Sequence, residues 1–191
     1  MGRTRAFDRD VALERALEEF WRHGYEATSV AGLTAAMGIN PPSLYAAYGD
    51  KRRLFGEAVR HYQETHGAFA ARALAGEPTA RAAVGRLLRE AAEVYTDPAH
   101  PPGCMIISAG VNTTDPGVIG ELREHREAGK AAIRRRVERD VETGVLPPET
   151  DAGALATFFA SVIQGMSTQA RDGAAREDLF AVATLAMRAW P

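Results

Sequence analysis

The sequence predicts an all-α protein built from two helical units. Apolar residues recur at the three- and four-residue spacing of amphipathic helices along most of the chain, and no stretch alternates as a strand would. Glycines and prolines separate these stretches, where helices end and restart. The 191 residues are 46% hydrophobic and 25% charged, a composition that supports a substantial core. We expect a three-helix unit at residues 1–50 and a larger helical unit at residues 51–191.

The N-terminal unit contains three predicted helices. The first begins at an aspartate N-cap and spans residues 8–24, and the second covers residues 30–37. The second helix ends at Gly38, because glycine adopts the left-handed conformation that closes a helix. Asn40 then caps the third helix, which covers residues 41–48 and begins with a proline pair that the first turn tolerates.

The second unit continues with helices only. Asp50 is a predicted N-cap, and Asp115 followed by Pro116 marks another helix start. Charged residues in the middle of the long helix, including residues 134–136, predict a solvent-exposed face with ion pairs one turn apart. The predicted helices cover residues 51 to about 74, 80–95, 104–111, 116–144, 151–171 and 176–190.

Residues 30–48 have the layout of a helix-turn-helix, whose second helix usually lies in the DNA major groove. No charged residue occurs between Thr28 and Tyr48, so this helix would contact DNA through hydroxyls, prolines and backbone N–H groups. Thymine methyl contacts and groove shape are the alternatives for base recognition. The predicted DNA contacts are Arg3, Arg5, Thr28, Ser29, Asn40, Pro41, Pro42, Ser43, Tyr45, Tyr48 and Lys51.

Positive charges flank this motif on both sides. Residues 51–53 are Lys-Arg-Arg at a predicted helix start, where cations oppose the helix dipole unless a phosphate binds there. Lys51 is the cation that we favour for this contact, and a solvated turn is the alternative. Arg3 and Arg5 form a basic arm that could enter the minor groove or remain an unstructured tail.

The run TSVAGLTAAMGINPPSLYAAYGDKRRLFGEAV resembles the signature of the TetR/AcrR family of transcriptional regulators. Within it, GINPPSLYAAYGDK is similar to that family's turn, recognition helix and following lysine. Many relatives have Lys or Arg where this chain has Pro41 and Pro42. The resemblance implies a dimeric repressor, with an N-terminal helix-turn-helix DNA-binding domain and a C-terminal ligand-binding and dimerisation domain. It also implies release from a DNA operator by a small molecule.

The ligand pocket implied by the resemblance lies between helices of the second domain, where apolar cavities commonly form. By position on inward-facing sides of the predicted helices, the candidate ligand contacts are Tyr95, Cys104, Met105, Phe158, Gln164 and Met166. For each of them a plain core position is the favoured alternative. The absence of an obvious buried charge cluster favours a neutral or weakly polar ligand.

Cys104 is the single cysteine, which excludes an intrachain disulfide and fits a reducing compartment. It lies at a predicted helix start, where backbone N–H groups would lower the thiol pKa and favour a reactive thiolate. Redox or electrophile sensing is therefore one hypothesis, and a buried apolar residue or a pocket residue are the others.

The last two predicted helices interleave small and large apolar residues, a pattern that allows close antiparallel packing. Burial within one subunit is the alternative explanation of this pattern. The family resemblance favours a two-fold homodimer through these helices, which predicts a near-palindromic operator. The formal net charge is −2, and residues 1–60 carry nine basic against eight acidic residues. DNA affinity must therefore come from local placement of charge.

Ligand-responsive transcriptional regulation is the leading hypothesis. A helical small-molecule binding protein without DNA binding is one rival, and a thiol enzyme using Cys104 is another. No catalytic motif, cofactor loop or metal-ligand spacing occurs in the chain, so we expect no enzyme activity, cofactor or metal site. No apolar run is long enough to span a membrane and no signal peptide is present, which predicts a cytoplasmic protein.

Overall fold

The computed structural model describes residues 7–191, and every regular element in that range is helical, as predicted. Arg3 and Arg5, two of the predicted DNA contacts, lie outside the described residues. In chain order the elements are α1 (Arg9–Ala27), α2 (Val30–Met37), α3 (Pro41–Tyr48), α4 (Lys51–Glu64), α5 (Ala68–Gly76), α6 (Ala80–Tyr95), α7 (Met105–Ser108), α8 (Pro116–Glu142), α9 (Ala152–Arg171), α10 (Arg176–Ala186) and the 3₁₀ turn η1 (Met187–Ala189).

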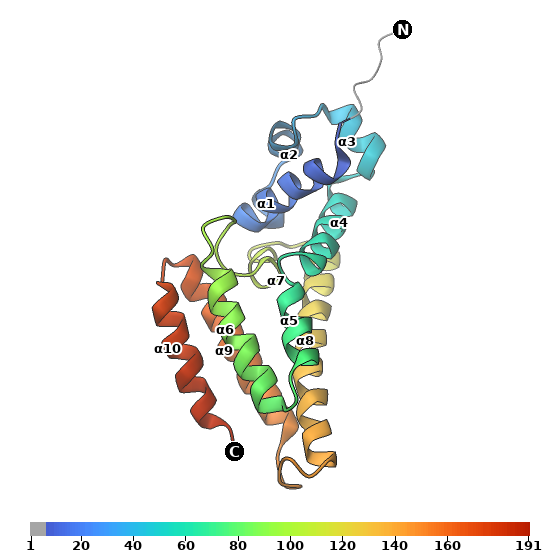
Figure 1. Ribbon diagram of the computed structural model, residues 1–191. Coiled ribbons are helices and arrows are strands. Elements are labelled where there is room, and N and C mark those ends of the chain that lie inside the picture. Colours follow the sequence, from blue (N-terminus) through green and yellow to red (C-terminus); the bar gives the residue numbers. More distant parts are fainter. Residues whose placement is uncertain (1–6) are drawn as a thin grey trace.

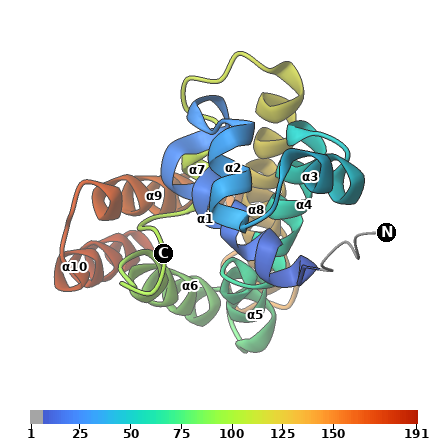
Figure 2. The ribbon, with the colours of Figure 1, turned by 90° about the horizontal axis from the view of Figure 1, so that it is seen from above.

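The helices form a small N-terminal unit and an elongated bundle. Figure 1 shows α1 to α3 at one end of the molecule, with α4 leading from them into the bundle and the short α7 at the junction. The view from above in Figure 2 places α9 and α10 side by side at one edge, where they pack on each other. Because α4 packs on α1 and also continues toward the bundle, the division at residue 50 stays a prediction.

A hydrophobic core runs through both units. Phe20 of α1 and Phe55 of α4 are fully buried and meet edge to face, with ring centroids 5.1 Å apart. Leu33 of α2 and Leu44 of α3 are also fully buried beside them. Burying a side chain of this size contributes about 1.5–3 kcal/mol. This packing fixes the orientation of α2 and α3 on α1 and α4.

The predicted N-caps are confirmed. The side chains of Asp8, Asn40, Asp50 and Asp115 each accept a hydrogen bond from a backbone N–H in the first turn of the following helix. These contacts satisfy donors that have no partner within the helix itself.

The single helix predicted from residue 51 to about residue 74 is wrong. The backbone N–H of Gly67 donates to the carbonyl oxygen of Tyr62 at 2.7 Å, which closes α4 before α5 begins. The turn also brings His66 to α1, with its Nε2 atom 2.9 Å from Oε1 of Glu14. A contact between residues 52 positions apart cannot be seen in local periodicity.

Two other predicted helices are shorter than expected. The segment predicted at residues 104–111 contains only the single turn α7. After it, the N–H of Val111 donates to the carbonyl oxygen of Ser108, three residues back instead of four, and the carbonyl oxygen of Ala109 accepts the N–H of Tyr25. The last predicted helix keeps its α-helical form only to Ala186 and then tightens into η1.

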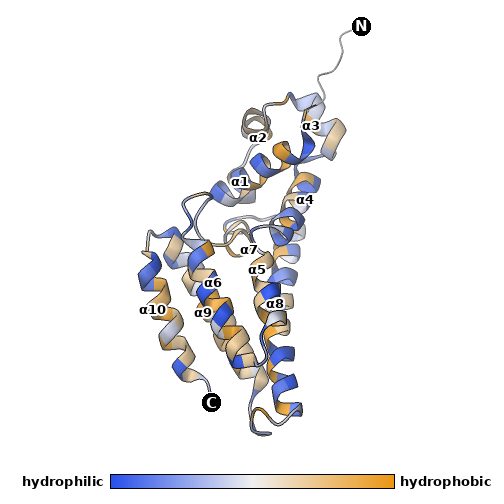
Figure 3. Ribbon diagram, viewed as in Figure 1, coloured by the Kyte–Doolittle hydropathy of each residue, from blue (hydrophilic) through white to orange (hydrophobic). Residues whose placement is uncertain are grey.

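Helix α8 is mostly solvent-exposed on its charged side, and Figure 3 shows hydrophilic residues recurring along it. Arg136 is one exception and corrects the predicted exposed face, because its side chain is only 10% exposed. Arg126, which donates to the carbonyl oxygen of Ile106, is another. Arg136 pairs with the buried carboxylate of Asp140, and it also donates to the carbonyl oxygen of Glu77 at 3.1 Å. The pair ties α8 to the start of α6, since Asp140 also accepts a hydrogen bond from the N–H of Ala80.

Candidate nucleic-acid interface and ligand cavity

The turn between α2 and α3 is held by backbone hydrogen bonds. Gly38 adopts the left-handed conformation with φ 68° and ψ 31°, and the next residue, Ile39, donates its N–H to the carbonyl oxygen of Thr34 at 3.1 Å. Asn40 Oδ1 then accepts the N–H of Ser43 at 2.9 Å, which starts α3. This geometry is that of a helix-turn-helix, as the sequence predicted.

Helix α3 presents an uncharged outer surface. Pro41, Pro42, Tyr45 and Ala46 are exposed, and Tyr45 is the large hydrophobic residue among them at 50% exposure. Ser43 is half-buried. The exposed face of α3 therefore offers one phenol, two proline rings and a methyl group to a groove.

Ser29 and Asn40 are exposed, and both already serve as helix N-caps. Their oxygens accept backbone hydrogen bonds. The Asn40 amide NH₂ and the Ser29 hydroxyl proton remain as hydrogen-bond donors for a bound molecule. A cap placed at this surface can orient the first turn of a helix toward DNA.

Thr28 and Tyr48 are corrected as predicted DNA contacts, because both side chains are buried. The Thr28 hydroxyl donates to the carbonyl oxygen of Gly24 at 2.6 Å. Tyr48 is 3% exposed, and its hydroxyl donates to the carbonyl oxygen of Arg9 at 2.9 Å. Both hydroxyls hold the three-helix unit together instead of facing outward.

The cations at the start of α4 have three different surroundings. Lys51, the predicted phosphate contact, places Nζ 4.3 Å from the centroid of the Tyr25 ring. Desolvation lowers the pKa of Lys51, and the charges of Glu26 and Asp115 oppose this only in part. In this arrangement Lys51 is turned toward α1 and away from α3.

Arg52 and Arg53, which follow Lys51, have different surroundings from it and from each other. Arg52 NH2 lies 2.7 Å from a carboxylate oxygen of Glu121 on α8, an ionic contact without the alignment of a hydrogen bond. The side chain of Arg53 is 76% exposed, with Asp50 at 3.9 Å as a loose neighbour. Arg53 is thus the cation of this turn that faces solvent, although sequence reasoning favoured Lys51.

An open hollow lies beside α3 and the first turns of α4. It has a volume of about 860 Å³ and carries three arginines along its length. Two carboxylates lie in the same hollow, so its charge is mixed with a basic excess. Its lining residues are Tyr45, Ala46, Ala47, Tyr48, Gly49, Arg52, Arg53, Gly56, Glu57, Arg60 and Glu121.

A separate cavity of about 390 Å³ lies in the bundle, between α4, α5, α6, α8, α9 and the residues around α7. Of the predicted ligand contacts, Tyr95, Cys104 and Gln164 line it. Sequence reasoning missed five polar lining residues, because only the packing of distant helices brings them together: Tyr62, Gln63, His125, Arg126 and Lys130. The larger apolar lining residues are Phe69, Leu74, Leu87, Ile106, Ile107, Ile133 and Ile163.

The other predicted ligand contacts do not line the cavity. Met105 and Met166 are 0% and 1% exposed and belong to the packed core. Phe158 is 41% exposed on the outer surface of α9, because the helix directs Phe159 inward in its place. These three assignments are corrected.

Cys104 is buried, and its surroundings favour the protonated thiol over the thiolate. Burial raises the pKa of its thiol, and the nearby Tyr62 and Tyr95 hydroxyls and backbone N–H groups offset this only in part. The predicted lowering of the pKa at a helix start is therefore wrong. The helix that follows has four residues, too short to stabilise a thiolate strongly against the cost of burial.

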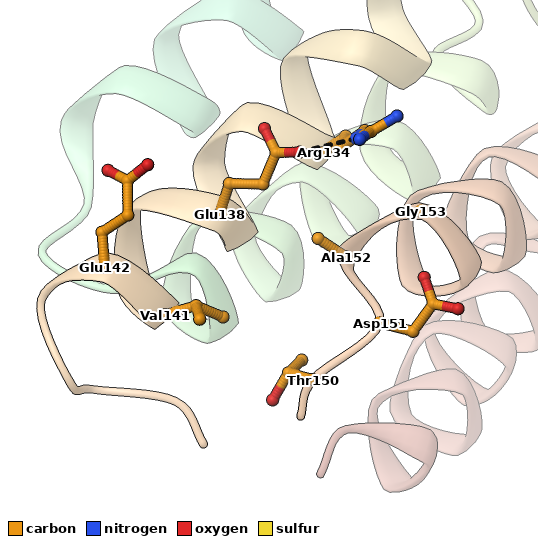
Figure 4. Close-up of a pocket in the computed structure, with 8 residues that line it drawn as sticks. All are labelled: Arg134, Glu138, Val141, Glu142, Thr150, Asp151, Ala152 and Gly153. Atoms are coloured by element: carbon orange, nitrogen blue, oxygen red, sulfur yellow. Dashed lines mark hydrogen bonds and ion pairs between the residues drawn. The ribbon is translucent and has the colours of Figure 1, made fainter. Parts of the chain in front are cut away.

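A third hollow of about 430 Å³ lies at the distal end of α8. Figure 4 shows that it is lined mainly by polar groups from α8 and the start of α9. Arg134 Nε is 2.6 Å from Glu138 Oε1, and Asp151 accepts the N–H of Ala154 as the α9 cap. Arg134 and Glu138 pair with each other, Asp151 is used as a helix cap, and the hollow lies at the end of α8 away from the helix-turn-helix, so we assign no ligand to it.

Residues 7–191 contain neither a metal-ligand cluster nor a membrane-spanning helix. The described part of the chain contains no cluster of three or more His, Cys, Asp or Glu side chains suited to hold a metal ion. None of its helices is both long and apolar enough to cross a membrane.

A helix-turn-helix with an exposed second helix, joined to a helical bundle that encloses an apolar cavity, defines a ligand-binding DNA-recognition protein. The chain belongs to the TetR family of bacterial regulatory proteins. The family model described as "Bacterial regulatory proteins, tetR family" matches residues 12–58. A second model, "Tetracyclin repressor-like, C-terminal domain", matches residues 80–179. The family membership and the two-part architecture predicted from the sequence are confirmed.

Several known proteins are similar over the full chain. The HTH-type transcriptional repressor ComR of Escherichia coli (strain K12) is 35% identical over 193 residues, covering 100% of this chain and 92% of ComR. The repressor BdcR of the same strain is 32% identical, covering 97% and 90%. A solved structure of a cysteine mutant of the TetR family regulator CifR, complexed with 26bp double-strand operator DNA, is 46% identical with a TM-score of 0.95, covering 99% of this chain and 100% of that chain.

Proposed function

We propose that this protein is a transcriptional repressor that binds a near-palindromic DNA operator as a homodimer and is released by a small molecule. The observation that carries the proposal is the exposed, uncharged face of α3 on a correctly formed helix-turn-helix. Its relatives ComR and BdcR are named repressors, and the similar CifR structure contains operator DNA.

The proposed DNA contacts fall into two groups. Pro41, Pro42, Tyr45 and Ala46 would meet base edges and thymine methyls, since they form the outer face of α3. Ser29, Ser43, Asn40, Lys51 and Arg53 would contact phosphates, which set the position of the protein on the duplex without reading its sequence. For Lys51 this requires that Nζ leave the Tyr25 ring when DNA binds.

The proposed dimer uses α9 and α10, as expected from the sequence. Phe158 on α9 and Val182 and Leu185 on α10 are apolar side chains that remain 38–58% exposed in one chain. Burying them against a second copy would remove the largest exposed apolar residues of this edge from water. A two-fold axis there would place two α3 helices about 34–36 Å apart or a multiple of that distance, which matches successive major grooves.

Two connections could transmit ligand binding to α3. Helix α4 starts at Lys51 beside α3 and has Tyr62 of its last turns on the cavity wall. Near α7, Ile106 and Ile107 line the cavity, and Ala109 directly after that helix accepts a hydrogen bond from Tyr25 at the end of α1. A ligand that favours one arrangement of α4 and α7 shifts the spacing of the two α3 helices by population shift.

The rival functions have less support. A thiol sensor or thiol enzyme needs an accessible thiolate, whereas Cys104 is buried with a raised thiol pKa. A binding protein without DNA binding would not require the exposed face of α3 beside three arginines. As a DNA-binding regulator, this protein would act in the bacterial cytoplasm.

Selection of bound sequences from a random duplex pool at moderate salt tests the proposal. We expect enrichment of one near-palindromic sequence, and loss of binding when an inducer-containing metabolite extract is added. If no sequence is enriched over the starting pool, the DNA-binding proposal is wrong. If a sequence is enriched but no extract releases it, the induction part of the proposal fails alone.

A further inference from the structure

The cavity in the bundle contains a buried phenol without a hydrogen-bond partner. Tyr62 is 1% exposed, lines the cavity, and its hydroxyl has no partner of adequate geometry within residues 7–191. The Cys104 thiol lies close to it and is only a weak acceptor. A buried hydroxyl left unpaired is unfavourable, and in native proteins such a group usually indicates a missing partner.

The wall around Tyr62 offers hydrogen-bond donors without charge. Tyr95 and Cys104 lie next to it, and burial raises the pKa of both phenols well above the usual value for tyrosine. Burial also raises the pKa of the Cys104 thiol. All three groups therefore remain protonated and neutral at physiological pH.

The cations near the cavity are already engaged. Arg126 donates from its guanidinium to the carbonyl oxygen of Ile106 at 3.0 Å, and Lys130 places Nζ 2.6 Å from a carboxylate oxygen of Glu127. His125 Nδ1 lies 3.1 Å from Nε2 of Gln63. An anionic ligand would have to lose its hydration to reach these cations, whereas a neutral ligand leaves their contacts in place and carries no charge to desolvate.

The remaining wall is apolar. Phenylalanine, leucine and isoleucine side chains from α5 to α9 and several alanines surround the space. A volume of about 390 Å³ is at the small end of ligand cavities, which span about 300–1,000 Å³. The space suits a hydrocarbon body with few polar atoms.

We infer that the inducer is a small neutral molecule with an apolar body and a hydrogen-bond acceptor oxygen, such as a carbonyl or ether oxygen, that accepts a hydrogen bond from the Tyr62 hydroxyl. The inference rests on the proposed function, because it takes this cavity as the inducer site. The ligand would then contact α4 directly through Tyr62. Helix α4 begins with Lys51 beside α3.

Binding of a matched set of probes to the full-length protein tests the inference. The probes are 2-nonanone, 1-nonene and nonanoate, which share a hydrocarbon chain and differ in the polar head, and binding is measured by isothermal titration calorimetry. We expect 2-nonanone to bind more tightly than 1-nonene and nonanoate. Tightest binding of nonanoate, or no binding of 2-nonanone, would overturn the inference.

The variant Tyr62→Phe separates the hydroxyl from the shape of the ring. It should reduce affinity for 2-nonanone by about 2- to 12-fold, the range expected for one neutral hydrogen bond, and leave affinity for 1-nonene unchanged. Because it removes an unpaired buried hydroxyl, its Tm should equal or exceed that of the wild type. An unchanged affinity for the ketone would contradict the assignment of Tyr62.

Operator binding is measured in parallel on the same preparations. If the wild type selects a DNA sequence but binds no ketone, the ligand chemistry is wrong and the repressor proposal stands. If the ketone binds as expected but no DNA sequence is selected, the cavity assignment stands and the repressor proposal fails.

Discussion

The backbone N–H of Tyr25 donates a 2.9 Å hydrogen bond to the carbonyl oxygen of Ala109. This bond joins the end of α1 in the DNA-binding unit to the residue that follows α7, whose Ile106 and Ile107 line the ligand cavity. The approach of the two segments requires Gly24, which has φ 78° and ψ 168°, a conformation that essentially only glycine adopts. The junction between the two units is therefore a defined backbone contact.

Replacement of Gly24 by alanine should destabilise the protein. A Cβ at this position would lie 3.3 Å from the Ala109 carbonyl oxygen, and the positive φ adds strain of about 1–3 kcal/mol. Urea unfolding measures the loss. The matched control is Gly120→Ala on α8, where a Cβ meets nothing within 4 Å, so stability should stay equal or rise. Equal unfolding midpoints for Gly24→Ala and the wild type would contradict the role of this contact.

Asn40 allows stability to be separated from DNA binding. Asn40→Ala removes the cap of α3 and should cost about 1 kcal/mol of unfolding free energy. Asn40→Asp keeps a capping oxygen and should preserve stability, while its negative charge should weaken binding to every duplex if this surface faces phosphates. Thermal unfolding and fluorescence anisotropy measure the two effects. Undiminished DNA affinity of a stable Asn40→Asp protein would place DNA elsewhere.

The cations at the start of α4 should act through phosphates. Arg53→Ala and Lys51→Ala should each weaken all duplexes to a similar extent and reduce the slope of log affinity against log salt by about 0.9. The control is Arg135→Ala, an exposed arginine on α8, which should leave the slope unchanged. A loss confined to one DNA sequence would mean that the residue reads bases. An unchanged slope for Lys51→Ala would mean that Nζ stays on the Tyr25 ring.

Glu14 should make stability depend on pH in the acid range. Burial acts to raise the pKa of this carboxyl, but hydrogen bonds and charge from His66 and His61 outweigh burial and lower it. A lowered carboxyl pKa contributes stability above the unfolded value near 4.5, and this contribution is lost as pH falls through the folded value. Because the side chain is 35% exposed, we expect about 1 kcal/mol or less.

Thermal unfolding of wild type and Glu14→Gln between pH 7 and pH 3 checks this effect. The wild type should be the more stable at neutral pH, and the two should converge at the acid end. Glu93→Gln, at an exposed position on α6, serves as the control and should follow the wild type throughout. A constant difference between wild type and Glu14→Gln at every pH would mean that the carboxyl pKa is not shifted.

The parts of the fold that depend on nearby residues could be predicted from the sequence. Asp8, Asn40 and Asp115 cap helices because of their own side chains and the residues directly after them. The glycine turn at Gly38 is local in the same sense, so the helix-turn-helix could be placed correctly.

What could not be predicted depends on distant contacts. Tyr48 is buried because its hydroxyl donates to Arg9 on another helix, and Arg136 is buried because it donates to the carbonyl oxygen of Glu77, 59 positions away in the sequence. The cavity wall was only partly found for the same reason. Tyr62 and His125 belong to helices far apart in the sequence, and no local pattern indicates that they share a cavity.

The most direct test of repression by operator binding is the affinity ratio between the selected operator and a scrambled duplex of equal length, measured by anisotropy at about 0.15 M salt. For specific recognition through two α3 helices we expect a ratio of about 10³ or more, with two protomers bound per operator. Scrambling one half-site alone should remove most of this preference. Equal affinity for operator and scrambled duplex would contradict the account.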